Sequence, residues 1–439
     1  MNSALQITPI LHPLHATVRV PGSKSLTNRA LLVASLAEGK TRLTNALFSD
    51  DSRYFAGALQ ALGFDVQLDE VNAEMTVTGL GGKIPSPKAE LFIGNAGTAA
   101  RFLSAFLTLG HGEYILDGDA RMRERPIGDL IEALAQLGTE IEAVNNCPPV
   151  KIKASGLPGG KTKIAGNISS QFLSALLMVA PFAKAQVQIE VITELNSKPY
   201  VDMTLAVMQD FGVDVHREGY RYFSIPQTPY RSTTSGDHSP LSNQKSKVSN
   251  YPIESDASAA SYFFVAPALC GGTVRVLNIS RDSKQGDTAF LEILKLMGCS
   301  VEERDQDLQV TGHSPLQGVD VDMRDIPDTA QTLAAVAPFA SSPTRIRGIA
   351  SARVKETDRI HATCMELTRL GVQVDEHEDG MTIYPCQTFQ PSNVQTFNDH
   401  RMAMAFSLIG LRVPGITIEN PACVSKTFPN YFEVLDSLR

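Results

Sequence analysis

The residues with the clearest capacity for chemistry are cations that lie beside glycines and hydroxyl side chains. The stretch Pro21-Gly22-Ser23-Lys24-Ser25-Leu26-Thr27-Asn28-Arg29 runs directly into the apolar segment 30–36, which is typical of a helix. The amides and the dipole at the start of such a helix attract phosphate or carboxylate, and Lys24 and Arg29 add positive charge. The G-x-x-x-x-G-K-[ST] spacing of a P-loop is absent. The stretch therefore predicts an anion site of another kind, and the alternative is a solvated lysine in a turn.

Three further cation groups occur later in the chain. They are Arg121-Met122-Arg123-Glu124-Arg125-Pro126, Arg353-Val354-Lys355-Glu356-Thr357-Asp358-Arg359 and Ser425-Lys426-Thr427-Phe428-Pro429. In the second group we expect Lys355 and Arg359 on one helical face, with Glu356 beside them. Such neighbours normally form surface ion pairs of little energetic value. A carboxyl group held among several cations can instead act as an acid or a base, because its neighbours tune its pKa.

Several polar clusters precede apolar segments, as residues at helix starts do. They are Gly94-Asn95-Ala96-Gly97-Thr98, Asn167-Ile168-Ser169-Ser170-Gln171, Glu254-Ser255-Asp256-Ala257-Ser258 and Asn398-Asp399-His400-Arg401. One interpretation is helix capping alone. Their repetition favours a second interpretation, in which several helix starts bind anionic groups together. Asp328 also precedes an apolar segment, and there the plain interpretation is an N-cap.

Composition limits the classes of function. The 439 residues carry a net charge of −8, so the chain as a whole does not favour nucleic acid. It has no run of about 18 apolar residues and no signal-peptide pattern, so we expect a cytoplasmic protein without a membrane partner. The six cysteines are scattered without a C-x-x-C pair or histidine partners, which predicts reduced thiols and no metal site.

The elements that must position these groups form an internal repeat. Amphipathic helical patterns end at Gly63, Gly138, Gly212, Gly298 and Gly371, and a strand pattern follows each of them. Glycine is expected there because the residue after a helix commonly adopts a left-handed conformation. The spacing is about 75 residues, apart from a longer interval between Gly212 and Gly298.

Each repeat also contains a second, more apolar helical segment. These segments cover residues 29–37, 98–109, 170–180, 257–268, 329–340 and 400–410, and β-branched strands follow them. Helices that are apolar nearly all round belong in a core, so helices are expected inside and sheets outside. Six repeats fit the chain, and the sixth loses its last part at Arg439.

The longer interval suggests where the chain divides. Residues 226–250 are polar and rich in Pro, Ser and Thr, and we expect a mobile insertion there. Three repeats on either side predict two similar domains of the α/β class. We place one at residues 21–250 and the other at residues 1–20 plus 251–439.

Eight stretches together resemble the signatures of the EPSP synthases, the 3-phosphoshikimate 1-carboxyvinyltransferases of the enolpyruvyl transferase family. They are Pro21 to Ser25, Gly94 to Thr98, Arg121 to Pro126, Ser169 to Phe172, Ser197-Lys198-Pro199-Tyr200, Arg353 to Arg359, Asn398 to Met402, and Lys426 to Pro429. They follow the family's order and span nearly the whole chain.

The resemblance implies an architecture and a reaction. Each domain would contain three βαβαββ units, an inside-out α/β barrel with buried parallel helices that point at an interdomain cleft holding the active site. The enolpyruvyl group of phosphoenolpyruvate would move to the 5-hydroxyl of 3-phosphoshikimate through a tetrahedral intermediate, giving 5-enolpyruvylshikimate 3-phosphate and phosphate. This step of the shikimate pathway leads to chorismate and the aromatic amino acids. No metal or organic cofactor is implied.

The resemblance also implies the site residues. Those for 3-phosphoshikimate are Lys24, Ser25, Arg29, Ser169, Ser170, Gln171, Ser197, Tyr200, Asp328, Ser351 and Lys355. Those for phosphoenolpyruvate are Lys24, Asn95, Gly97, Arg125, Gln171, Glu356, Arg359, Arg401 and Lys426. Asp328 would take the proton from the 5-hydroxyl, and Glu356 with Lys24 would protonate the methylene carbon.

The chain departs from the family's pattern in a few places. Ser351 stands where many relatives have an asparagine, so a water or a closer approach would be needed. Ala100 and Phe102 replace Met and Pro, which alters packing behind the phosphoenolpyruvate site. The 226–250 insertion has no assigned role.

Two alternatives compete with this interpretation. A UDP-N-acetylglucosamine enolpyruvyl transferase would share the fold but usually carries a cysteine before its Arg-Pro motif, and residues 111–126 contain none. A repeat-built protein that docks an acidic partner would instead disperse its cations over exposed helix faces. Under the favoured interpretation we expect a monomer whose partners are its two substrates. Because Gly97 leaves room at the phosphoenolpyruvate site, we also expect inhibition by glyphosate.

Overall fold

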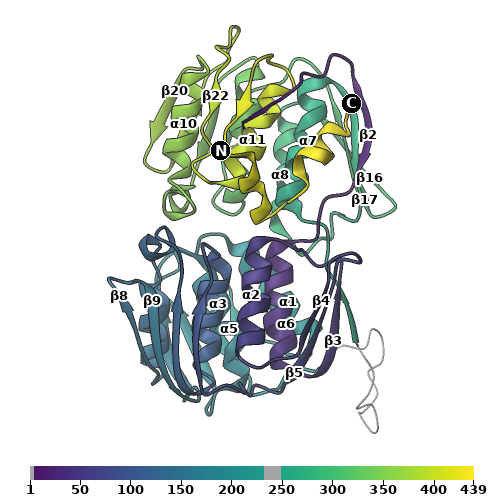
Figure 1. Ribbon diagram of the computed structural model, residues 1–439. Coiled ribbons are helices and arrows are strands. Elements are labelled where there is room, and N and C mark those ends of the chain that lie inside the picture. Colours follow the sequence, from purple (N-terminus) through teal and green to yellow (C-terminus); the bar gives the residue numbers. More distant parts are fainter. Residues whose placement is uncertain (1–3, 232–248) are drawn as a thin grey trace. The chain divides into compact units, whose positions relative to one another are not determined.

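The computed structural model describes residues 4–231 and 249–439, and the chain separates into two compact units (Figure 1). The central unit is Gly22–Ile253, and the terminal unit is Met1–Pro21 with Glu254–Arg439. The expected boundary after residue 250 differs from this division. Strand β14 (Ser249–Pro252) pairs in parallel with β3 (Glu38–Thr44), so residues 251–253 belong with the central unit.

In its described residues, the central unit contains three buried inner helices, three outer helices and three sheets. The inner helices are α1 (Lys24–Leu36), α3 (Gly97–Leu107) and α5 (Ser170–Val179), and the outer helices are α2 (Asp50–Ala61), α4 (Gly128–Gln136) and α6 (Lys198–Asp210). The other strands are β4 (Val66–Asp69), β5 (Glu74–Leu80), β6 (Lys88–Phe92), β7 (His111–Asp117), β8 (Glu140–Val144), β9 (Cys147–Ser155), β10 (Gly160–Ile164), β11 (Val187–Val191), β12 (His216–Glu218) and β13 (Tyr222–Ile225). They form sheets in the orders β14-β3-β5-β4, β6-β7-β9-β8 and β10-β11-β13-β12.

The terminal unit repeats the same plan. Its inner helices are α7 (Ala257–Cys270), α9 (Ala330–Val336) and α11 (His400–Gly410), and its outer helices are α8 (Phe290–Leu296), α10 (Arg359–Arg369) and α12 (Tyr431–Asp436). Its strands are β1 (Leu5–Gln6), β2 (Leu14–Val18), β15 (Gly272–Val276), β16 (Ser300–Arg304), β17 (Asp307–Gly312), β18 (Asp320–Asp322), β19 (Thr344–Arg347), β20 (Val374–His377), β21 (Gly380–Ile383), β22 (Asn393–Val394) and β23 (Thr417–Ile418). The sheets run β16-β17-β15-β2, β18-β19-β21-β20 and β1-β23-β22. The α/β fold of buried helices and outer sheets is therefore as predicted.

One topology recurs in the four-stranded sheets. In the second repeat, β6 pairs in parallel with β7, and β7, β9 and β8 then pair antiparallel. A parallel pair needs a crossover connection, which inner helix α3 supplies between β6 and β7. The strands next to the two points where the chain passes between units pair outside their own repeat. Strand β2 precedes α1 but pairs with β15, the strand that follows α7. Strand β14 precedes α7 but pairs with β3, the strand that follows α1.

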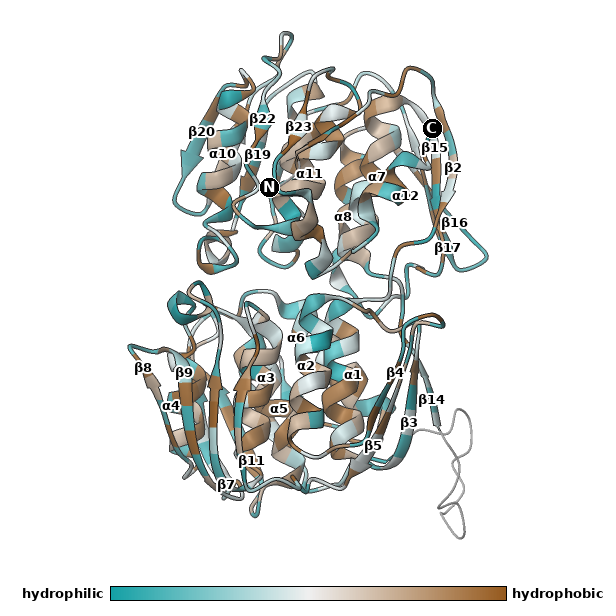
Figure 2. Cartoon of the chain, in the orientation of Figure 1, coloured by the Kyte–Doolittle hydropathy of each residue, from teal (hydrophilic) through white to brown (hydrophobic). Residues whose placement is uncertain are grey.

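The position of the inner helices follows from their composition. Every residue of α3 and α11 is buried, as are eleven residues of α1. Figure 2 shows α5 and the part of α1 after its polar first turns as largely hydrophobic. Burial of such helices is driven by removal of apolar surface from water. The glycines predicted to end the outer helices do so, and all five have positive φ: Gly63, Gly138, Gly212, Gly298 and Gly371.

The predicted 226–250 insertion is wrong at both ends, and at its second end residues 249 and 250 belong to β14. Tyr230 is buried, its hydroxyl donates to the Met178 carbonyl at 2.9 Å, and its ring lies 5.8 Å from that of Phe182. Gln227 Nε2 donates to the Ala183 carbonyl at 3.0 Å. Residues 226–231 therefore pack on the central unit, because Tyr230, an aromatic residue within the polar run, is buried against Phe182. Residues 232–248 lie outside the described part of the chain.

None of the helices within residues 4–231 and 249–439 is long and apolar enough to cross a membrane.

Candidate active site

The first predicted anion site lies at the start of α1. Ser23 is the N-cap, and its hydroxyl accepts from the Leu26 amide at 3.4 Å. Lys24 and Ser25 begin the helix and remain partly exposed, and Lys24 Nζ lies 3.7 Å from a carboxylate oxygen of the buried Asp51. The loop therefore presents its lysine and one hydroxyl at the helix start.

Arg29 lies beneath this helix start, only 1% exposed. Its Nε donates to Thr204 Oγ1 at 2.7 Å, and its terminal nitrogens donate to the carbonyls of Ser25 and Tyr200 at 3.0 Å each. The guanidinium carbon lies 5.3 Å from the ring centre of Phe102. Burial lowers the pKa of Arg29 to about 10, with a partial offset from Tyr200. The arginine thus joins the first turns of α1 and α6, which carry other candidate residues.

A second cation lies at the start of α3. Its N-cap is Ala96, which has no side chain to accept from the first amides. Arg125 Nη1 donates to Asn95 Oδ1 at 2.9 Å and to the Asn95 carbonyl at 3.2 Å. The guanidinium occupies the space next to Gly97, where a Cβ atom would overlap it. Glycine at this position therefore lets the arginine lie where a larger residue would displace it.

Arg101, which the sequence did not single out, holds this arrangement from behind. Its Nη2 donates to the Pro126 carbonyl at 2.5 Å, and its Nη1 donates to the Gly97 carbonyl at 3.3 Å. The side chain is buried. Arg101 therefore holds the Arg125 loop in place against the first turn of α3.

The remaining candidates of the central unit lie at two more helix starts. Ser169 caps α5 by accepting from the Gln171 amide at 3.2 Å, and Gln171 Nε2 donates to Thr98 Oγ1 on α3 at 3.3 Å. Ser197 is the N-cap of α6, with φ of 57°, and its carbonyl accepts from the Tyr200 amide at 3.0 Å. Polar side chains from α1, α3, α5 and α6 therefore gather around the starts of these helices.

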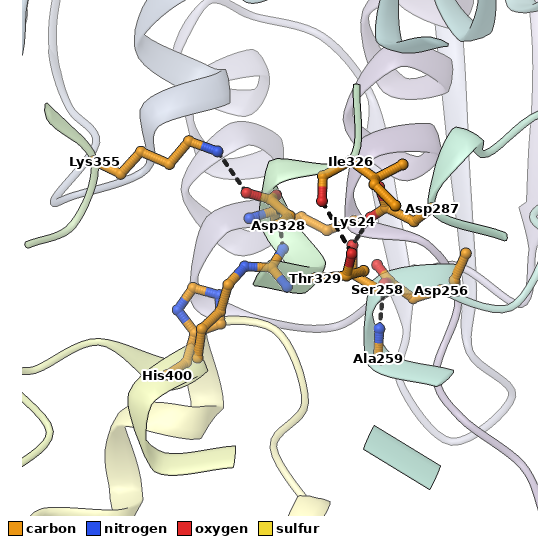
Figure 3. Close-up of polar contacts among 12 residues, drawn as sticks. Lys24, Asp256, Ser258, Ala259, Asp287, Ile326, Asp328, Thr329, Lys355 and His400 are labelled. Atoms are coloured by element: carbon orange, nitrogen blue, oxygen red, sulfur yellow. Dashed lines mark hydrogen bonds and ion pairs between the residues drawn. The ribbon is translucent and has the colours of Figure 1, made fainter. Parts of the chain in front are cut away.

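In the terminal unit, the candidates converge on Asp328. One carboxylate oxygen accepts from Lys355 Nζ at 2.5 Å (Figure 3) and from Arg359 Nη1 at 3.2 Å. The other accepts from Arg401 Nη2 at 2.7 Å. Asp328 lies in a 3-10 turn, Pro327–Thr329, whose N-cap is Ile326. The predicted N-cap role for Asp328 is therefore wrong, because its carboxylate bonds to three cations instead of helix amides.

The expected helical pairing of Lys355 with Arg359 is also wrong. Asp358 caps α10 by accepting from the His361 amide at 3.0 Å, so the helix begins at Arg359. Lys355 instead follows a 3-10 turn, Ala350–Val354, which also contains Ser351. The two cations nevertheless reach the same carboxylate, Lys355 from the segment before α10 and Arg359 from the first residue of the helix.

Arg359 connects three carboxylates. It is 3% exposed at the side chain, and it donates to Asp328, to Glu356 Oε2 at 2.7 Å, and to Asp399 Oδ2 at 2.7 Å through its Nε. Burial opposes its charge, but Asp399, Glu356 and Asp328 together raise the pKa of Arg359 above its ordinary value. The nearby Lys426 Nζ lies 3.8 Å from Glu356 Oε1. Glu356 is therefore held between two cations, only 7% exposed.

Lys355 differs from the arginines in its proton affinity. Burial lowers the pKa of Lys355, and Arg359 and Arg401 act in the same direction, while Asp328 opposes them. Its side chain keeps 25% exposure, more than that of Arg359 or Arg401. It is thus the cation of the group best able to exchange its carboxylate partner for a ligand.

A second buried acid, Asp287, lies in the same unit. Ser258 at the start of α7 donates to it, and Asp256 caps that helix by accepting from the Ala259 amide at 2.8 Å (Figure 3). Burial and the negative charge of Asp328 raise the pKa of Asp287 to about 6, although the hydrogen bond from Ser258 lowers it. Asp287 is therefore a carboxyl group that resists ionisation next to one that is surrounded by cations.

Across residues 4–231 and 249–439, no group of three or more His, Cys, Asp or Glu side chains is arranged to hold a metal ion. All six cysteines are free, and burial raises the pKa of Cys364 and Cys423 to about 12. Such thiols are protonated at neutral pH and are poor nucleophiles.

Comparison with known proteins identifies the family. The model of the family described as EPSP synthase (3-phosphoshikimate 1-carboxyvinyltransferase) matches residues 9–435. The chain belongs to the EPSP synthase family.

Individual relatives agree with this membership. A 3-phosphoshikimate 1-carboxyvinyltransferase of Nostoc punctiforme is 47% identical over 98% of this chain and 97% of its own length. One of Sulfurovum sp. is also 47% identical, over 100% of this chain and 99% of its own. The structure of EPSP synthase from Acinetobacter baumannii has a TM-score of 0.80 at 26% identity and covers 99% of this chain and 98% of that one. The enolpyruvyl transferase NikO of Streptomyces tendae, at 18% identity and a TM-score of 0.78, shares the fold.

The family match disfavours the two alternatives. The similar full-length relatives carry the 3-phosphoshikimate name, not that of a UDP-N-acetylglucosamine enzyme. A repeat-built docking protein would leave its cations on exposed faces, whereas Arg29, Arg125, Arg359 and Arg401 are all buried.

Sequence reasoning missed several residues that shape these EPSP synthase clusters. They are Asp51, Arg101, Asp287 and, as the partner of Arg359, Asp399. Arg101 stands one turn after Gly97 in a segment already singled out, which was the available signal. Asp51 and Asp287 carry no local signal, since each looks like an ordinary acidic residue near a helix start.

Asp287 supports a prediction about stability and pH. The folded-state pKa of about 6 lies above the ordinary value of 3.8, so the folded state binds this proton more tightly than the unfolded state. The stabilisation from this group is present below about pH 4 and is lost as pH rises through about 6. At pH 7.5, the Asp287→Asn variant should therefore have a free energy of unfolding up to about 3 kcal/mol higher than that of the wild type.

Urea unfolding followed by circular dichroism at pH 4.5 and pH 7.5 checks this difference. Glu292→Gln is the matched control, because that carboxylate is 62% exposed and should show little pH-dependent change. An Asp287→Asn effect of equal size at both pH values would contradict the linkage.

Proposed function

We propose that the clustered residues of both units serve one reaction, the transfer of the enolpyruvyl group of phosphoenolpyruvate to the 5-hydroxyl of 3-phosphoshikimate. The observation that carries the assignment of residues is the terminal-unit network. Two carboxylates, Asp328 and Glu356, share Arg359 and are otherwise surrounded by cations. An acid and a base placed beside cations suit a reaction between an alcohol and an enol phosphate, whose charge must be stabilised.

The start of α3 is suited to the anionic groups of phosphoenolpyruvate. Its first amides lack a side-chain cap, and Arg125 lies against Gly97. Amides at a helix N-terminus and a guanidinium both donate to phosphate or carboxylate oxygens. We assign phosphoenolpyruvate to Lys24, Asn95, Gly97, Arg125, Gln171, Glu356, Arg359, Arg401 and Lys426. In this set, Asn95 acts by orienting Arg125, to which its oxygens are bonded.

Hydroxyl side chains and partly exposed cations are suited to 3-phosphoshikimate. We assign this substrate to Lys24, Ser25, Arg29, Ser169, Ser170, Gln171, Ser197, Tyr200, Asp328, Ser351 and Lys355. Arg29 contributes by holding the carbonyls of Ser25 and Tyr200, because its nitrogens already bond to the protein. Hydroxyls complement the substrate's own hydroxyl groups, and the cations complement its phosphate and carboxylate.

Asp328 takes the proton of the 5-hydroxyl in this proposal. Its three cation partners favour the ionised form that can accept a proton, but they also weaken it as a base. Lys355 relieves this conflict. When it turns from Asp328 to a substrate anion, the carboxylate loses one cation and becomes a stronger base.

Glu356, with Lys24, delivers a proton to the methylene carbon. The 5-oxygen then bonds to the neighbouring carbon, and a tetrahedral intermediate forms. In the second half, a proton leaves the new methyl group, the carbon–oxygen bond to phosphate breaks, and the double bond returns. The reaction as a whole therefore removes one proton from the hydroxyl and releases one proton with the phosphate. The proposal includes a cytoplasmic monomer that glyphosate inhibits.

Phosphate release tests the reaction itself. Mixing the protein with 3-phosphoshikimate and phosphoenolpyruvate should release inorganic phosphate continuously, while phosphoenolpyruvate with UDP-N-acetylglucosamine should not. A coupled phosphate assay measures both mixtures. Release only with the nucleotide sugar, or with neither acceptor, would refute the proposal.

Two variants test the proton-transfer roles. Glu356→Gln and Lys24→Met should each lower kcat by at least about 100-fold, because each removes a group that shares a proton transfer. The matched controls are Glu142→Gln and Lys151→Met, since those side chains form an exposed pair 3.7 Å apart. Rates within threefold of the wild type for either site variant would remove that residue from the chemistry.

Gly97→Ala tests the phosphoenolpyruvate and glyphosate site. The added methyl group would push against the Arg125 guanidinium, so the KM for phosphoenolpyruvate and the inhibition constant for glyphosate should both rise, by roughly 10-fold or more. Gly57→Ala on α2 is the control, because no atom lies near its added Cβ. Steady-state inhibition kinetics measures both constants, and unchanged glyphosate inhibition in Gly97→Ala would contradict the placement.

A further inference from the structure

The segment that carries Lys355 and Glu356 lies between two elements and belongs to neither. It follows the 3-10 turn Ala350–Val354 and ends where Asp358 caps α10. Both side chains must reach specific partners, Lys355 at Asp328 and Glu356 at Arg359. Since a short connecting segment has no internal ladder of hydrogen bonds, something outside it has to fix its position.

Arg353 supplies contacts of this kind. Its Nε donates to the Glu378 carbonyl at 2.9 Å, and its Nη2 donates to the His377 carbonyl at 2.6 Å. Its Nη1 donates to Asp358 at 2.8 Å and to Glu376 at 2.9 Å. One guanidinium thus joins the turn between β20 and β21 to the cap of α10, and Figure 1 shows α10 beside β20.

The neighbouring contacts make this junction rigid. Asp358 uses its other oxygen to accept from the His361 amide, and His361 Nδ1 lies 3.0 Å from Glu376. Ahead of the segment, the Ile349 amide donates to the Asp379 carbonyl at 2.8 Å. The segment from residue 350 to 358 is therefore held at both ends against the same β20–β21 turn.

We propose that Arg353 is a positioning residue, which sets the places of Lys355 and Glu356 without touching either substrate. This proposal rests on the proposed function of those two residues. Arg353 is 26% exposed, and partly exposed ion pairs contribute little to overall stability. Arg353 acts by fixing the positions of its partners. A guanidinium can donate to four acceptors at fixed angles, and an ammonium group cannot.

Kinetics of Arg353→Gln and Arg353→Lys test the proposal. Both should fold with melting temperatures close to that of the wild type, and both should lower kcat by roughly 10- to 100-fold, as small misplacements of reacting groups do. Arg347→Gln is the control, because that arginine is exposed on the neighbouring β19 and pairs with Asp320 at 2.6 Å. It should keep full activity.

The pH dependence of kcat separates positioning from simple loss of folded enzyme. Displacing Glu356 from Arg359 and Lys426 removes cations that favour its ionised form. Because Glu356 acts as the proton donor, the alkaline limb of the profile should therefore move to higher pH in Arg353→Gln. Fewer folded molecules would lower kcat equally at every pH. A lower kcat with an unmoved limb would therefore overturn the proposal.

A double variant tests the contact with Asp358. Asp358→Asn keeps a side chain that can cap α10 but removes the charge. If Arg353 acts through this contact, the double variant should be no more than about twofold slower than Arg353→Gln. Fully multiplied losses would show that the two residues act independently and would contradict the proposal.

Hydrogen exchange gives a readout that does not depend on the reaction. Amides of residues 350–358 should exchange faster in Arg353→Gln, with the rest of the chain unchanged. A wild type that releases no phosphate would refute the proposed function, whereas an active wild type with unchanged kcat and exchange in Arg353→Gln would refute only the positioning role.

Discussion

The charge of Arg359 is the interaction on which the terminal-unit cluster depends. A guanidinium that is almost fully buried would cost several kcal/mol in lost hydration if it stood alone. Three carboxylates offset that cost, and in doing so they are drawn to fixed positions: Asp399 at the start of α11, Asp328 before α9, and Glu356 before α10. The acid and the base of the proposed reaction are therefore placed by a shared counter-ion rather than by contact with each other.

The candidate arginines of the central unit are held by a different kind of partner. Arg29 and Arg125 bond to neutral oxygens, as in the contacts of Arg29 with Thr204 and of Arg125 with Asn95. A cation bonded to neutral groups keeps its full charge for an anionic ligand. The N-terminus of α3, which has no side-chain cap, adds the positive end of its helix dipole beside Arg125. The two units thus differ in electrostatics although they share a fold.

The sequence predicted the repeat, the inner helices and the family, because these depend on periodicity and on local motifs. The helix-ending glycines are an example, since Gly63 and its counterparts must adopt positive φ wherever the rest of the chain lies. Asp328 was misjudged because an aspartate before a helix has the same local pattern whether it caps the helix or meets distant cations. Tyr230 was misjudged for a similar reason, since a polar run hides the one side chain that has a buried partner.

The three arginines of residues 121–126 show that burial, more than membership of one sequence motif, decides whether a cation can bind a ligand strongly. Arg121, Arg123 and Arg125 stand together in the sequence, yet Arg121 pairs with Glu124 and Arg123 with Asp117 on the surface, while Arg125 is buried against Gly97. A surface pair gains little, because water already solvates both partners. A buried guanidinium has lost that solvent, so any anion that reaches it meets a strong and directed attraction. The absence of a Cβ at Gly97 lets this buried cation lie against the start of α3, beside the helix amides that would bind the same ligand.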